Sequence, residues 1–214
     1  MAIRRALYMD LGIIFPNVHL NLNHLAPKGE YNILLNEVPI AHGRLNPGHY
    51  FVFESKTTLE VMGIESIPDK PIISDQPTSW VPFRYKQDLD MAKINYMGPS
   101  RLIAYHISTI LRKHAPEFIG LQETIRLIKM MEEKFPDLVQ ELQKVLSVPQ
   151  ITEVLQRLVE EGISIRNLRD IFHYLIEWGP KEKDTILLTE YVRSGIKRYI
   201  SHRYSAGKNI LGVY

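Results

Sequence analysis

The sequence contains no cysteine among its 214 residues. That absence excludes disulfide scaffolds, thiolate metal sites and cysteine nucleophiles, and it fits a protein of the reducing cytosol. The sequence also lacks any apolar run near the roughly 20 residues that cross a bilayer, and its N-terminal run MAIRRALYMDLG lacks the apolar core of a signal peptide. We therefore expect the chain as it stands to be soluble and cytoplasmic.

Neither sign of charge dominates the sequence. It has 26 lysines and arginines against 24 aspartates and glutamates, and these charges are interspersed rather than gathered in blocks. A basic surface for binding phosphates is therefore not evident. The hydrophobic share of 45% is enough to bury a core in one or two compact domains.

Recognisable catalytic and metal-binding patterns are missing as well. The sequence has no H-E-x-x-H pattern, no nucleophile elbow, no dinucleotide-binding turn, and no glycine frame before the run SKTT at 55–58. The histidines form no pair at ligand spacing beside a carboxylate. They are His19, His24, His42, His49, His106, His114, His173 and His202. We expect no enzyme, no cofactor and no metal site, and we interpret SKTT as a solvated loop.

Strand patterns dominate the first 55 residues. The run FPNVHLNLNHL alternates apolar and polar residues, which predicts a strand over 15–25 with Val18, Leu20 and Leu22 on one face. Residues 55–79 contain three prolines, which remove backbone donors and favour an extended loop with short strands at most. The other predictions here are a helix over 2–10 and strands over 30–38, 40–45, 49–55 and 80–83.

Helical periodicity dominates the rest of the chain. The predicted helices cover 85–95, 101–118, 120–135, 136–146, 147–161, 164–178 and 185–204. A sheet-rich part followed by a helical part predicts an α+β fold with subdomains.

The best-defined stretch is the helix pair at 147–178. Ser147 and Gln150 have the spacing of a capping box, which predicts that a helix starts at Ser147. Gly162 suits the left-handed cap that ends this helix, and Ser164 is expected to cap the next one. Apolar residues recur at three- and four-residue steps in both helices, so each is expected to bury one face.

Three interpretations of the polar side of this pair stay open. The first is a helix-turn-helix that binds nucleic acid, because Arg166, Asn167 and Arg169 lie at the start of the second helix. Glu160, Glu161, Asp170 and Glu177 flank these arginines and would repel phosphates, which weakens that interpretation. The second is a contact between copies of the chain, where charges of both signs set the register. The third is a solvated face.

Three runs of residues carry a family resemblance that covers nearly the whole chain. They are LQRLVEEGISIRNLRDI at 155–171, HAPEFIGLQET at 114–124, and DLGIIFPNVHLNLN followed by EYNILLNEVPIAHGRLNPG within the first 48 residues. Together they resemble the cytoplasmic domain of the FHIPEP family, the export-gate proteins of bacterial flagellar and type III secretion systems. The virulence branch looks nearer than the flagellar one. The resemblance implies a longer inner-membrane protein whose membrane-spanning half lies upstream and whose cytoplasmic half contains this chain.

The resemblance also implies a division of the chain into subdomains. Residues 1–47 and 98–119 would form a first α/β subdomain, and 48–97 a small α/β subdomain inserted into it. Residues 120–203 would form a helical subdomain, and 204–214 a linker to a fourth, C-terminal subdomain. The breaks at 46–48 and 98–100 are also breaks in composition.

The function that the resemblance implies is a ring, usually of nine copies, that docks chaperone–substrate complexes and gatekeeper proteins without enzymatic activity. Contacts between neighbouring copies are implied for the helix pair, where the candidates are Arg157, Glu160, Ser164, Arg166, Asn167 and Arg169. A partner groove is implied at Met62, Gly63, Tyr105 and His106. Only Gly63 matches the Asp-Pro-x-Phe-Gly run of flagellar relatives, and Tyr105-His106 stands where relatives have Thr-His.

Overall fold

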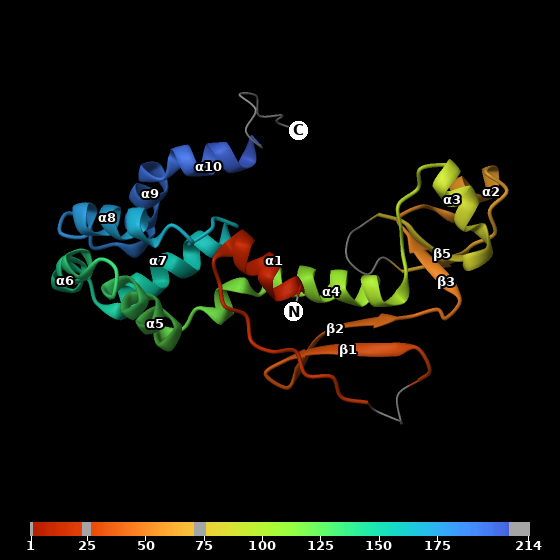
Figure 1. Ribbon diagram of the computed structural model, residues 1–214, viewed down its shortest axis with the longest axis horizontal. Helices are drawn as coiled ribbons and strands as arrows, with labels where there is room; N and C mark the ends of the chain where they lie inside the picture. Colours follow the sequence, from red (N-terminus) through yellow and green to blue (C-terminus); the bar gives the residue numbers. More distant parts are fainter. Residues whose placement is uncertain (1, 23–26, 71–75, 206–214) are drawn as a thin grey trace. The chain divides into compact units, whose positions relative to one another are not determined.

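The computed structural model describes residues 2–22, 27–70 and 76–205, and it divides the chain into two compact units (Figure 1). The sheet unit is the continuous segment 17–112. The helical unit combines the N-terminal residues 1–16 with residues 113–214. Strands lie in the first unit and most helices in the second, so the predicted α+β fold class is confirmed.

The sheet unit contains two small antiparallel sheets and short helices. Its elements are β1 (Glu30–Leu35), β2 (Val38–Arg44), β3 (His49–Val52), α2 (Lys56–Val61), β4 (Ile67–Asp69), β5 (Thr78–Pro82), the 3-10 turn η1 (Phe83–Tyr85), α3 (Lys86–Met91), β6 (Tyr96–Met97) and α4 (Pro99–Lys113). The last residue of α4 already belongs to the helical unit.

The hairpin β1–β2 begins its second strand earlier than predicted. Asn36 and Glu37 have φ angles of 49° and 69°, and Leu35 pairs with Val38 across this two-residue turn. Positive φ at both central positions is the geometry of the turn that matches the twist of a hairpin. The predicted strand over 30–38 is therefore wrong at its end, because the chain reverses at Asn36.

The second sheet has the strand order β4-β5-β3-β6 and packs helices on both faces. Side chains alternate between the faces along a strand. Val52 on β3 therefore packs in one cluster with Leu59 of α2 and Leu89 of α3. Its neighbour Phe51 packs in another cluster with Leu102 of α4. The helices α2 and α4 thus lie on opposite faces of this sheet.

The strand predicted over 15–25 is wrong in its described part. None of residues 15–22 belongs to a strand, and residues 23–25 lie outside the described ranges. Val18, Leu20 and Leu22 are 58%, 88% and 82% exposed. Alternation produces a strand only where a neighbouring strand takes its hydrogen bonds and a core covers its apolar face. Of the described strands, β1 is paired with β2 instead.

The loop predicted over 55–79 contains a helix. Ser55 is the N-cap of α2, and its hydroxyl accepts a hydrogen bond from the backbone N–H of Thr58 at 3.1 Å. The run SKTT is therefore a helix start rather than a solvated loop. The predicted short strand is present as β4, and residues 71–75 lie outside the described ranges.

The helical unit is built from two segments that are distant in sequence. Its elements are α1 (Ala2–Leu11), the 3-10 turn η2 (Ala115–Phe118), α5 (Leu121–Glu132), α6 (Pro136–Val145), α7 (Val148–Glu160), α8 (Leu168–Trp178), α9 (Thr185–Gly195) and α10 (Lys197–Tyr204). Among the described helices, none has both the length and the apolar composition needed to cross a membrane.

The core of this unit lies between α7 and the helices around it. Leu155 and Leu158 of α7 and Phe172 of α8 are fully buried, and burying a side chain of this size contributes about 1.5–3 kcal/mol. Helix α9 packs on both α7 and α8, and α6 packs on α8. The faces that helical periodicity predicted as buried in α7 and α8 are confirmed.

The N-terminal helix joins this core through its C-terminal end. Leu7 and Phe15 are buried, and the ring of Phe15 meets that of Phe118 edge to face at 5.1 Å. Gly12 ends α1 with φ +81°, and a Cβ there would lie 2.7 Å from the backbone nitrogen of Arg166. Only glycine fits both the conformation and the space.

The helix predicted over 185–204 is divided into α9 and α10. The division falls at Ile196, whose φ of −89° and ψ of 13° leave helical geometry. Gly195 lies against the ring of Tyr174 on α8, because a Cβ added to it would lie 2.5–2.6 Å from three ring carbons. The break therefore occurs beside a close contact between α9 and Tyr174 of α8.

Replacing Gly195 with alanine is expected to lower the free energy of unfolding by about 1–3 kcal/mol, because the tyrosine ring must shift. Gly98→Ala is the matched control, since a Cβ at Gly98 meets no atom within 4 Å. Urea unfolding of both variants measures the difference. Equal stabilities would contradict the close approach of α9 to Tyr174.

Candidate protein-interaction surface

The turn between α7 and α8 is closed by a complete Schellman motif. Gly162 has φ +73° and donates its N–H to the carbonyl of Val159, while the N–H of Ile163 reaches back to Leu158 at 2.8 Å. These two bonds satisfy carbonyls that the end of α7 would otherwise leave free. Ile163 is buried, so the motif has its usual apolar contact. The predicted cap at Gly162 is confirmed, and so is the helix start at Ser147, whose backbone N–H donates to the side chain of Gln150 at 3.0 Å.

Helix α8 begins later than predicted. Asn167 is its N-cap: its side-chain oxygen accepts the N–H of Asp170 at 3.4 Å, and its amide donates to the Asp170 carboxylate at 2.6 Å. The expectation that Ser164 caps this helix is wrong. Ser164 is 1% exposed, and its hydroxyl accepts the N–H of Arg166 at 3.4 Å. Its side chain therefore has almost no surface to offer a partner.

Two arginines satisfy the last carbonyls of α1. Arg166 donates through Nη1 to the carbonyl of Met9 at 3.1 Å. Arg203 of α10 donates to both the carbonyl and the carboxylate of Asp10. A cation at the C-terminal end of a helix is favourable because carbonyl dipoles point towards it. Arg166, predicted as a contact between copies of the chain, thus has a role inside it.

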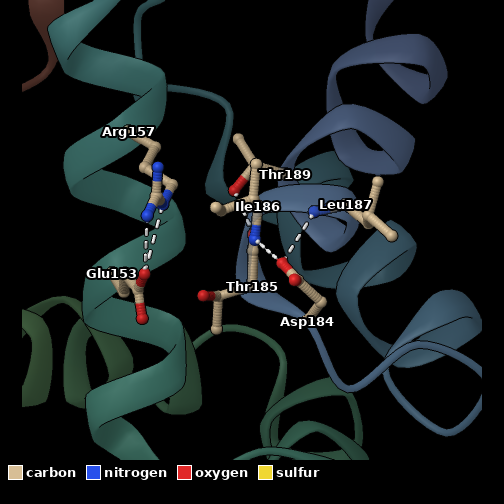
Figure 2. Close-up of polar contacts among 7 residues, drawn as sticks. All are labelled: Glu153, Arg157, Asp184, Thr185, Ile186, Leu187 and Thr189. Atoms are coloured by element: carbon tan, nitrogen blue, oxygen red, sulfur yellow. Dashed lines mark hydrogen bonds and ion pairs between the residues drawn. The ribbon is translucent and has the colours of Figure 1, made fainter.

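Arg157 lies in a small polar cluster where α7 meets the start of α9 (Figure 2). It pairs with Glu153 one turn earlier at 2.9 Å. A hydrogen bond from Thr185 lowers the pKa of Glu153, and the bond and charge of Arg157 lower it further. Beside them, Asp184 caps α9 by accepting the N–H groups of Ile186 and Leu187. The Arg157 side chain is 35% exposed, so its outer edge stays accessible.

The two remaining candidates of the helix pair are exposed. Glu160 is the last residue of α7, and Arg169 lies in the first turn of α8. The guanidinium of Arg169 stacks on the ring of Phe135 at 4.9 Å, an arrangement that favours arginine. Of the six predicted residues, Glu160, Arg166 and Arg169 are therefore exposed near the turn, and Arg157 is about one-third exposed.

A shallow groove beside this turn contains residues that were not predicted. Its volume is about 390 Å³, and it is lined by Glu161, Ile163, Arg193, Ser194, Lys197, Ile200, Ser201 and Tyr204. Arg193 bridges Glu161 at 2.9 Å and Glu190 at 2.6 Å. The spacing of Arg193, Lys197, Ser201 and Tyr204 at three- and four-residue steps could have revealed this polar face. Arg193 and Lys197 line the groove together with Glu161, and Arg193 is paired with two carboxylates. Such mixed charge suits a protein surface better than a phosphate backbone.

The four predicted groove residues belong to two helical regions on opposite faces of the sheet in the sheet unit. Gly63 follows α2 and lines an open pocket of about 570 Å³ together with His49, Lys56, Glu60, Ile64, Glu65, Ser66, Ile67 and Pro82. Met62 beside it is 48% exposed. Tyr105 and His106 belong to α4, which packs on the opposite face of the sheet. Tyr105 is 42% exposed, whereas His106 is only 2% exposed. Their role as a partner groove stays a prediction.

Within 2–22, 27–70 and 76–205, no three His, Asp or Glu side chains are grouped so that they could hold a metal ion.

Comparison with known proteins defines the class of this fold and surface. The FHIPEP family model matches residues 1–214, so the chain belongs to the FHIPEP family. Its relatives are export-gate proteins of type III secretion systems. Low calcium response locus protein D of Yersinia pestis is 44% identical over 212 residues, which is 99% of this chain and 30% of that protein. The chain thus spans under a third of that relative.

Solved structures agree with this assignment. The Chlamydia pneumoniae CdsV protein is 40% identical with a TM-score of 0.89, and the match covers 100% of this chain and 62% of that one. The same protein has also been solved in complex with CdsO. A chain of the nonameric EPEC SctV-C structure is 31% identical with a TM-score of 0.76, covering 96% of this chain and 62% of that one.

Removing the Arg166 side chain tests its role as a cap of α1. Arg166→Ala is expected to cost about 1 kcal/mol of stability, because the carbonyl of Met9 loses its donor. Arg198→Ala on the exposed side of α10 is the matched control and should be near neutral. The measurement is urea unfolding at one pH and salt concentration. A neutral Arg166→Ala would show that the bond to Met9 contributes nothing.

Proposed function

We propose that this chain is the cytoplasmic, ring-forming part of a type III secretion export gate. On this ring, secretion substrates, their chaperones and gatekeeper proteins dock before export across the inner membrane. The strongest support is the fold match to a relative that was solved as a nonamer. The CdsV–CdsO complex adds a relative that binds another protein. The described surface supports binding rather than catalysis, since its polar groups form ion pairs and helix caps.

The turn at the end of α7 is the surface that we assign to the neighbouring copy. Glu160 is exposed there, Arg157 presents its outer edge, and the groove at Glu161 adjoins it. Both signs of charge lie close together, so a neighbouring copy could be held in register by complementary pairs. Such rim charges contribute more to orientation than to affinity.

Binding of nucleic acid has weaker support. Each polar residue at the start of α8 has a partner within the chain: Arg166 bonds Met9, Asn167 bonds Asp170, and Arg169 stacks on Phe135. A helix that reads a DNA groove needs such side chains free to reach base edges and phosphates. Duplex DNA should therefore not retain the chain at physiological salt.

Charge reversal at Arg157 tests the ring. Arg157→Glu in the full-length protein is expected to reduce ring assembly and secretion, while the chain stays folded. Repulsion from Glu153 one turn away costs only about 0.2–0.5 kcal/mol. Arg126→Glu is the matched control, because Arg126 is an exposed arginine of α5 that also pairs with a glutamate one turn away. Mass measurement of the assembled ring and a secretion assay give the result. Normal ring mass and secretion in Arg157→Glu would remove this residue from the contact.

Docking of export partners is tested separately at Tyr105. Its ring contacts Phe53 edge to face at 6.1 Å, and 42% of the side chain is exposed. Exposed aromatic side chains are frequent anchors of protein interfaces. Tyr105→Ser is expected to weaken binding of a chaperone–substrate complex at least tenfold, with ring assembly intact. Tyr8→Ser is the control, because Tyr8 of α1 is 41% exposed. Equal affinities in titration calorimetry would exclude Tyr105 from the docking surface.

A further inference from the structure

Helix α4 carries a buried imidazole with one specific partner. His106 is 2% exposed, and its Nδ1 lies 2.9 Å from the hydroxyl of Tyr31 on β1. The two rings meet edge to face, with centroids 5.8 Å apart and planes at 75°. This pair, which we name the Tyr31–His106 latch, joins the β1–β2 hairpin to α4 within the sheet unit.

The protons in the latch follow from the tyrosine. Burial, with a smaller contribution from the charge of Asp69, raises the pKa of Tyr31 to about 12. The phenol therefore keeps its proton at every physiological pH. It can donate this hydrogen bond to Nδ1 of a neutral imidazole, whose single proton is then on Nε2. Burial lowers the pKa of His106, which favours this neutral form.

The position of the tyrosine ring is set by the hairpin. Tyr31 pairs with Gly43 on β2, and a Cβ at Gly43 would lie 2.4 Å from the Tyr31 hydroxyl. The ring thus lies across the strand pair in space that only glycine leaves open. The latch therefore connects both strands of the hairpin to α4.

The charges around His106 disfavour its protonated form. Burial lowers the pKa of His106, and the nearby imidazole of His42 on β2 lowers it further. Asp69 of β4, which interacts with the Tyr31 phenol, accepts a hydrogen bond from Trp80 at 2.6 Å. On α4 itself, the residues one turn from His106 are Leu102, Ile103, Thr109 and Ile110, and none of them carries a charge. No carboxylate of α4 therefore stabilises a charged imidazole.

We propose that the Tyr31–His106 latch is an acid-sensitive fastening that releases the β1–β2 hairpin from α4 when His106 takes up a proton at Nδ1. Protonation at Nδ1 removes the acceptor of this bond, so the phenol can no longer donate to the imidazole. It also places a positive charge in a buried site next to His42. The hairpin opens because the proton binds more favourably when the imidazole reaches water.

The direction of the pH effect follows from the neutral latch. The pKa of His106 is lower when the hairpin is closed than its ordinary value of 6.5. The open form therefore binds more protons between these two values, and the closed form loses stability as pH falls through them. The Tyr31–His106 latch therefore contributes its full stability above about pH 6.5, and this contribution falls below that pH.

Hydrogen exchange at the backbone amides of the whole chain tests the latch. Between pH 7.5 and 5.5, after correction for intrinsic exchange rates, protection of the β1–β2 amides is expected to fall by up to about tenfold per pH unit below 6.5. Amides of α7 in the helical unit should keep their protection. A parallel loss at α7 would indicate general acid unfolding and would overturn the proposal.

Two variants isolate the imidazole. His106→Asn places an amide oxygen near the position of Nδ1 and cannot titrate, so the extra loss of hairpin protection at low pH should disappear. His114→Asn is the control, because His114 pairs with Glu117 outside the latch, and it should behave as the original chain. A pH dependence that persists in His106→Asn would overturn the proposal.

A further test uses the unsubstituted chain, so it does not depend on whether a variant folds. Titration of the His106 imidazole by NMR should give a midpoint below that of an ordinary histidine. A midpoint at or above 6.5 would overturn the proposal, whatever the variants show.

Discussion

The reversal of the chain at Gly162 is the constraint on which most of the helical unit depends. Its left-handed backbone closes the Schellman motif of α7 and turns the chain so that Ile163 and Ile165 are buried. From there the N–H of Ile165 reaches the carbonyl of Leu11, and Arg166 reaches that of Met9. One turn therefore ends α7, places the start of α8, and holds the N-terminal helix against residues that follow it by more than 150 positions.

This use of the arginines changes how the surface should be interpreted. Arg166 and Arg203 bond the C-terminal end of α1, and Arg169 stacks on the ring of Phe135. The first role of these three charges is therefore to stabilise the fold of one chain. The exposed charge next to the turn comes instead from Glu160, the outer part of Arg157, and the Glu161–Arg193 pair. A contact between copies built on this surface would be polar and adjustable, as suits subunits that assemble from folded protomers.

Sequence patterns predicted correctly those parts of the fold that depend on residues close together in the sequence. The helix start at Ser147, with its bond to Gln150, and the glycine cap at Gly162 involve residues a few positions apart, and both were predicted correctly. The strand predicted over 15–25 is absent from residues 15–22, because a strand depends on partners that a sequence window does not show. Ser164 and Asn167 are both good caps, and the burial of Ile165 between them decides for Asn167. The partner of Arg166 lies 157 positions earlier, so no local pattern could reveal it. Arg193 and Lys197 had a helical spacing that could have been noticed.

The most direct test of the central claim is the accessibility of the turn in an assembled ring. The chain has no cysteine of its own, so a single cysteine in place of Glu160 reports on that position alone within it. A second variant with the cysteine in place of Arg198 is the reference. A thiol reagent is expected to modify position 160 at least tenfold more slowly in the ring than in the monomer, while position 198 reacts equally in both. Equal rates at position 160 in ring and monomer would show that the turn after α7 does not contact a neighbouring copy.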